Sequence, residues 1–184
     1  MFINNFYNSP ALMFSGNAHT NRLYAALNRY RQLQAEGRLG RALAALMGRS
    51  TALKNLEKVT DENRVASRRR VGLRSVPLNQ ICGSEGRTKD FDRHFNPLRS
   101  HTRQRWLSVM AARWTDVPLP PVELIRIGDA YFVRDGHHRI SVAHALGESC
   151  IDAEVTAWEL AEPAAAAAAA RVRLPNANLS GARS

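Results

Sequence analysis

The sequence predicts an α+β fold, in which a small mixed sheet with helices follows a basic, mostly helical arm. Apolar residues recur at helical spacing early in the chain. Farther along, short apolar runs bounded by glycine and proline alternate with helical segments. We therefore expect the arm at residues 1–72, the sheet-containing domain at residues 73–160, and an alanine-rich, low-complexity tail at residues 161–184.

The arm is expected to contain three helices. The first spans His19–Ala35, and Gly37 is placed to end it. A second, short helix is predicted at Arg41–Met47, and a third within residues 50–59. The arginine run at residues 67–72 is interpreted as a charged linker to the domain.

Within residues 73–160 strands and helices alternate. Pro97 can open a helix, and the prolines from Pro118 onward end it. Gly128 makes a tight turn between two strands, and Gly147 ends the last helix. The expected strands are 73–81, 122–128, 130–135 and 151–158, and the expected helices are 98–114 and 137–146.

The net charge is +10, and the basic excess is concentrated in the arm. Residues 1–72 carry 12 Lys and Arg against 4 Asp and Glu, whereas residues 73–160 carry 11 of each kind. A basic arm suits a polyanionic partner such as nucleic acid or an acidic membrane surface. It equally suits a solvated helical face that keeps the chain soluble.

The sequence favours a cytoplasmic protein without a membrane partner. No stretch approaches the run of about 18 apolar residues that a membrane-spanning helix needs. The first residues lack the basic region of a secretory signal. Cys82 and Cys150 fit neither zinc nor thioredoxin spacing, so reduced thiols are expected.

The chemistry is concentrated in one turn of five residues. Asp135 ends a strand, Gly136 makes the turn, and the first helical turn then carries His137, His138 and Arg139. Free backbone N–H groups and the positive end of the helix dipole meet there, which makes a natural anion site. Three basic side chains oppose that dipole unless an anion or Asp135 compensates them, which favours a phosphate cradle.

Other interpretations of the turn are open. The histidines can be polar turn residues, with Arg139 paired to Asp135. A metal site is disfavoured, because adjacent helical residues point about 100° apart and no HxxxH or HExxH motif is present. Ser141 and Cys150 are weak candidate nucleophiles: a mid-helix hydroxyl usually faces solvent or bonds to the chain, and a cysteine opening a strand is expected to be buried.

The element order and the run "DGHHRISVAHALG" followed by a strand resemble the ParB N-terminal/sulfiredoxin-like domain family, from Leu73 to about Trp158. In ParB proteins the equivalent turn binds the triphosphate of CTP, and in sulfiredoxins it holds ATP phosphates beside a reactive cysteine. The resemblance implies that Gly136, His138 and Arg139 bind a nucleoside triphosphate, CTP or ATP, with or without Mg²⁺.

The same resemblance implies further roles. Arg87 matches a nucleotide-binding arginine in an upstream loop of ParB. His137 stands where sulfiredoxins carry their cysteine, so sulfinic-acid reduction is not expected. The turn also resembles the Asp-Gly-His-x-Arg turn of related free-serine kinases, in which an upstream acid is the base. The candidate catalytic residues are Glu85, Asp90, Asp92, Asp135 and His137.

Four functions are consistent with these residues, and whether the chain is an enzyme stays open. The first is binding of a nucleotide or another phosphorylated ligand at the turn. The second is a small phosphotransferase or nucleotide hydrolase. The third is a nucleic-acid-associated protein that acts through its basic arm, although only the alanine-rich tail follows where ParB has a helix-turn-helix domain. The fourth is a degenerate domain kept for protein contacts. The sequence gives no oligomeric state.

Overall fold

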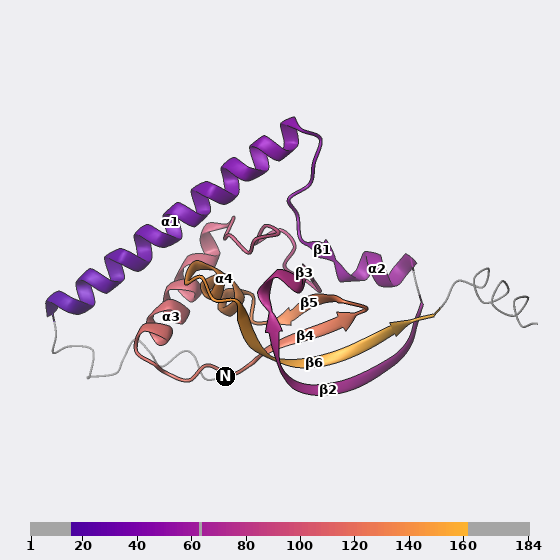
Figure 1. Cartoon of the computed structure of the whole chain (residues 1–184). Coiled ribbons are helices and arrows are strands. Elements are labelled where there is room, and N and C mark those ends of the chain that lie inside the picture. Colours follow the sequence, from indigo (N-terminus) through magenta and orange to yellow (C-terminus); the bar gives the residue numbers. More distant parts are fainter. Residues whose placement is uncertain (1–15, 63, 162–184) are drawn as a thin grey trace, which may run out of the picture.

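The computed structural model describes residues 16–62 and 64–161, which are built around one six-stranded mixed sheet (Figure 1). The sheet order is β1-β3-β5-β4-β6-β2. The strands are β1 (Lys54–Asn55), β2 (Val65–Pro77), β3 (Ile81–Ser84), β4 (Val122–Ile127), β5 (Ala130–Asp135) and β6 (Cys150–Leu160). The helices are α1 (Gly16–Leu46), α2 (Leu56–Glu62), α3 (Arg103–Trp114) and α4 (His137–Ala145), with the 3₁₀ turns η3 (Leu78–Gln80) and η4 (Ser100–Thr102). The predicted α+β class is confirmed.

Three apolar clusters hold these elements together. The largest joins α4 to the sheet and includes Val122, Val133 and Ile140, each fully buried. A second joins α1, α3 and α4, and a third joins α2 to strand residues such as Phe132. In Figure 1, α1 accordingly lies outside α3 as an additional layer. The arm is thus packed onto the domain rather than separate from it.

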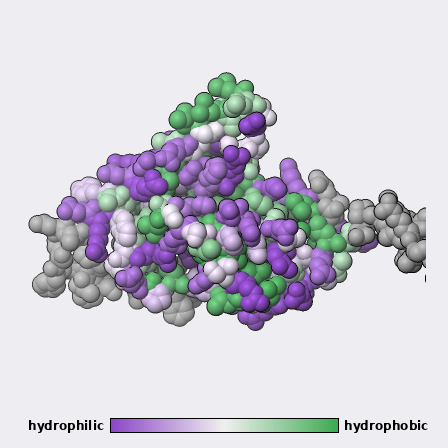
Figure 2. Space-filling view, in the orientation of Figure 1, coloured by the Kyte–Doolittle hydropathy of each residue, from purple (hydrophilic) through white to green (hydrophobic). Residues whose placement is uncertain are grey.

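The first helix differs from its prediction, because α1 is continuous where the sequence predicted two helices. Gly37, which was expected to end the first of them, lies inside α1. A Cβ at this position would stand 3.1 Å from both the Asn96 Cβ and the Leu98 Cδ2. Gly37 therefore lets α1 approach the loop before α3. Beyond this contact the helix projects outward, and Figure 2 shows hydrophobic atoms at its exposed end, where Leu46 and Met47 lie.

The predicted linker at residues 67–72 is wrong, because these residues belong to β2. This strand pairs antiparallel with β6 along its length, with Arg68 opposite Trp158. The Arg68 guanidinium lies 4.3 Å from the Trp158 ring centroid, within range of a cation–π interaction. Exposed arginines are compatible with an edge strand, since charge there discourages pairing with other chains. The expected boundary between residues 72 and 73 falls inside β2.

Most other elements follow their predictions, but the helix predicted within residues 50–59 begins only at Leu56, directly after β1. The β4–β5 hairpin turns at Gly128, whose φ is 58°, and α4 ends before Gly147, whose φ is 73°. The strand predicted at 73–81 is divided into the end of β2, η3 and β3. Within the described residues, no helix is both long and apolar enough to cross a membrane. The predicted tail from residue 162 onward lies outside the described part of the chain.

Candidate functional site

The turn between β5 and α4 is shaped by Gly136 and its neighbour on β4. Gly136 has a φ of 99°, a left-handed conformation that residues with a side chain rarely adopt. A Cβ there would also stand 2.5 Å from Cγ1 of Val122. No side chain caps the start of α4. The N–H groups of its first turn therefore lie where a helix ordinarily lacks internal partners.

His137 is buried and its ring is fixed on both sides. Its Nε2 lies 2.7 Å from Ser84 Oγ, and its ring stacks on Phe91. Ser84 Oγ also accepts hydrogen bonds from the N–H groups of Gly86 and Arg87. With both acceptor positions occupied, the Ser84 hydroxyl donates its proton to Nε2, so His137 is neutral with its own proton on Nδ1. Burial, followed by the charge of Arg87, lowers the pKa of His137 to about 4.

His138 is also buried, but one of its ring nitrogens lacks a hydrogen-bond partner among the described residues. Its ring meets Phe91 edge-on, with centroids 5.4 Å apart. Its Nε2 is buried and has no hydrogen-bond partner among the described residues. Burial, and then the positive charges of Arg87 and Arg105, lower the pKa of His138 to about 4. The structure thus places a neutral imidazole with an unused ring nitrogen in the first turn of α4.

Arg139 is engaged with protein groups. Its guanidinium donates to the backbone oxygens of Pro120 and Pro121, the latter at 2.9 Å, and to the Asp135 carboxylate at 2.6 Å. These bonds tie the turn to the proline segment before β4. The ion pair with Asp135 is the one expected if the turn is simply a polar turn without a ligand. A phosphate contact from Arg139 would require exchange of these partners.

The three candidate acids of the upstream loop have separate surroundings. Asp92 is buried and accepts hydrogen bonds from the N–H groups of His94 and Asn96, both at 2.9 Å. Glu85 pairs with Arg134 on β5 at 3.1 Å. Asp92 therefore holds the loop in shape, and Glu85 holds it to the sheet.

Of these three acids, Asp90 is the one whose charge acts on the histidines of the turn. Its carboxylate lies 3.3 Å from Arg87 Nη1 and 3.3 Å from His101 Nε2. Its charge opposes the lowering of the pKa of both His137 and His138. The structure thus brings Asp90 and Arg87 into the surroundings of the two histidines.

Sequence reasoning missed three residues of this site. Ser84 bonds to His137, Phe91 contacts both imidazoles, and Arg105 adds a second positive charge near His138. Ser84 and Phe91 carry no signal, because an isolated serine and an aromatic residue in a loop are common. Arg105 lies in a helix rich in arginine, where nothing distinguishes it from its neighbours.

The weaker candidates have structural surroundings. Ser141 is buried and accepts a hydrogen bond from the Trp106 indole N–H at 2.9 Å. Cys150, which was expected to be buried, is exposed, because it opens β6 at the end of the sheet. No three His, Cys, Asp or Glu side chains of the described residues gather in a way that could hold a metal ion.

Comparison with known proteins gives a fold likeness. Among solved structures, the chain is similar to sulfiredoxin from Arabidopsis thaliana, with 19% sequence identity and a TM-score of 0.37. The match covers 55% of this chain and 98% of the sulfiredoxin chain. No family model and no curated protein matches. Membership of the ParB/sulfiredoxin-like family stays a prediction from the turn and the element order.

Proposed function

We propose that this chain binds the phosphate groups of a nucleotide at the first turn of α4. The observation that carries this proposal is the buried His138 Nε2, which lacks a partner in the described chain and belongs to an uncapped helix start. Helix N-termini bind anions through their N–H groups and dipole, and a neutral imidazole adds one donor. A buried polar atom without a protein partner often marks a ligand or water position.

The surrounding charges support an anion at this position. Arg87 and Arg105 act on His138, and Asp90 is the acid that acts against them. Gly136 is itself buried, and it shapes the turn because Val122 and the Arg139 guanidinium occupy the space that a side chain would need. In this proposal Arg139 is a positioning residue, since its bonds to Pro121 and Asp135 hold the turn in place.

Thermal unfolding with a nucleotide panel tests the proposal. We expect ATP, CTP or ADP, with or without Mg²⁺, to raise the melting temperature, because a ligand that binds only the folded state stabilises it. Arg87→Ala and Arg105→Ala should each reduce the shift. Arg74→Ala, which removes an exposed arginine from the far edge strand β2, is the matched control and should keep it. The proposal fails if no nucleotide shifts the melting temperature of the wild-type chain.

Phosphoryl transfer is a second candidate function, favoured by the position of Asp90. A carboxylate near a bound nucleotide can accept the proton of an attacking hydroxyl, whose oxygen bonds to the γ-phosphorus while the bond to the β–γ bridging oxygen breaks and the nucleoside diphosphate leaves. We predict that Asp90→Asn keeps the nucleotide-induced thermal shift and loses turnover of γ-labelled nucleotide. Asp129→Asn, at the β4–β5 turn, is the control and should turn over as the wild type does. Equal turnover by Asp90→Asn and wild type would remove Asp90 from this role.

A further inference from the structure

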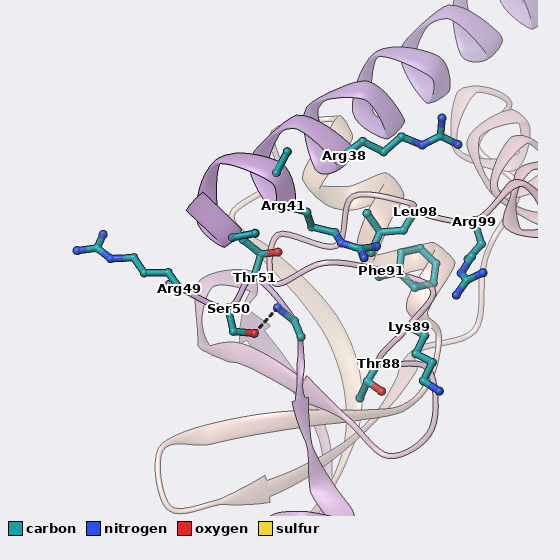
Figure 3. Close-up of a pocket in the computed structure, with 13 residues that line it drawn as sticks. Arg38, Arg41, Arg49, Ser50, Thr51, Thr88, Lys89, Phe91, Leu98 and Arg99 are labelled. Atoms are coloured by element: carbon teal, nitrogen blue, oxygen red, sulfur yellow. Dashed lines mark hydrogen bonds between the residues drawn. The ribbon is translucent and has the colours of Figure 1, made fainter. Parts of the chain in front are cut away.

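A basic pocket lies between the end of α1 and the loop before α3, and it shares Phe91 with the surroundings of the α4 turn. Its volume is about 850 Å³, and Phe91 and Leu98 contribute apolar lining (Figure 3). None of the lining residues is acidic. Five of them are basic, namely Arg38, Arg41, Arg49, Lys89 and Arg99.

The positive charge of this pocket is not neutralised by the protein. None of its five basic residues forms an ion pair with another described residue. The acids of the adjoining loop have other partners, since Asp90 pairs with Arg87 and His101, and Asp92 binds backbone N–H groups. Like charges around one concave surface repel one another, so an anionic ligand there would be favoured.

The walls of the pocket are fixed by packing. Gly37 lets α1 approach the loop, where Leu98 is buried against it. Tyr30 is buried on the same helix and donates a hydrogen bond to the backbone oxygen of Arg99 at 3.0 Å. Two segments distant in sequence are therefore held at a set separation, and each contributes arginines. The basic residues meet because of the fold rather than because of their order in the chain.

The arrangement of the cations suits an extended ligand. Figure 3 shows Arg41 reaching toward Phe91 and Leu98, while Arg49 points away from them. Arg31 is exposed and stands seven residues before Arg38, which places both on one side of α1. Positive charge therefore continues along α1 beyond the pocket on the side of Arg31, which suits a ligand longer than the pocket.

We infer that the pocket and the adjoining side of α1 bind the phosphodiester backbone of a nucleic acid strand. Arginines suit this chemistry, because each guanidinium can donate two hydrogen bonds to one phosphate. Phe91 is fully buried, so its ring face offers no platform for base stacking. The remaining contacts are to phosphates, which are the same in every sequence, so we expect binding that is independent of base sequence. A lipid surface fits less well, since the cations line a concavity that a flat bilayer does not enter.

Fluorescence anisotropy with the full chain and a labelled single-stranded oligonucleotide of about 20 nucleotides tests this inference. Arg41→Ala/Arg99→Ala removes one cation from each wall. We expect it to weaken binding about tenfold and to lower the slope of log affinity against log salt by roughly 1 to 1.5. The control, Arg69→Ala/Arg74→Ala, removes the same charge from β2 and should lose markedly less. Matching melting curves establish that both variants are folded.

Each other outcome overturns the inference. An equal loss in the two double variants would mean that net charge alone binds the strand. Displacement of the oligonucleotide by equimolar inorganic triphosphate would indicate a small polyphosphate site. Binding to vesicles that contain phosphatidylserine, without binding to the oligonucleotide, would indicate a membrane surface. The nucleotide-induced thermal shift distinguishes this inference from the proposal for the α4 turn, since Arg41→Ala/Arg99→Ala should leave that shift intact.

Discussion

At the scale of single residues, the two adjacent histidines have different contacts. His137 stacks on Phe91 and bonds to Ser84, whereas His138 meets Phe91 edge-on and leaves Nε2 without a partner among the described residues. The divergence follows from the helix, which turns each successive side chain by about 100°. The two rings therefore differ in role: His137 holds the upstream loop through Ser84, whereas His138 contributes a buried Nε2 that no described residue binds.

The lowered pKa values of these histidines predict a loss of stability in acid. In the folded chain the two imidazoles take up protons only near pH 4. In the unfolded chain they take them up near the ordinary histidine pKa of 6.5. The stability that the neutral histidines contribute is therefore fully present above pH 6.5 and is lost as the pH falls toward 4. We expect urea denaturation to show a loss of about 2 kcal/mol per histidine between about pH 7 and about pH 5.

Two variants distinguish the contribution of these histidines from general destabilisation by acid. His137→Gln/His138→Gln removes the two buried imidazoles and should flatten the pH dependence of the unfolding free energy. His94→Gln removes an exposed imidazole whose charge, after burial, also lowers the pKa of His144, so it should change the pH dependence much less than the double variant does. An unchanged pH dependence in the double variant would show that other groups cause the loss.

At the scale of elements, the two glycines inside α1 predict opposite behaviour. Gly40 has no atom within 4 Å of an added Cβ, whereas Gly37 packs against Asn96 and Leu98. Alanine is favoured over glycine in a helix interior by about 1 kcal/mol. We expect Gly40→Ala to raise the melting temperature by a few degrees. Gly37→Ala should gain less or lose stability, because the loop must move; an equal gain would mean that this contact is slack.

Local patterns predicted the elements that are decided by local forces. The β4–β5 hairpin and α4 have turn glycines and clear periodicity, so the sequence identified both. The continuity of α1 could not be foreseen, because Gly37 resembles a helix end until the loop against it is known. The arginines at positions 68 to 70 likewise suggested a linker, since only the pairing with β6 makes them a strand.

The sequence predicted the β5–α4 turn of the candidate site, but it did not predict which residues surround that turn. The glycine and two histidines were identified from "DGHHR", because strand, turn and helix are adjacent in sequence. The choice among Glu85, Asp90 and Asp92 needed the fold, which gives each acid different partners. The basic pocket was missed, since it joins arginines of α1 to a loop some fifty residues later.

At the scale of the whole molecule, the arm and the sheet depend on each other. A chain that begins at Leu73 would lack α1, α2, β1 and the first part of β2, including the residues that pair with Val155 to Leu160. It would also expose the α3 side chains that pack against Tyr30 and Leu33. We predict that this chain shows no cooperative unfolding by circular dichroism.

The matched comparison is a chain that begins at Gly16 and keeps every described element. It should unfold cooperatively, at a melting temperature near that of the full chain. Cooperative unfolding of the chain from Leu73 would show that the sheet folds without its first strands.

The pairing of β2 with β6 also determines when the sheet can be completed. β2 is made early, while its partner β6 is the last of the described strands to be made, and most of the described domain lies between them. β6 also pairs with β4, so its two edges form hydrogen bonds with two strands that are made earlier. Closing so long a loop before any pairing is gained slows folding. During synthesis, β2 therefore has no strand partner until β6 has emerged from the ribosome.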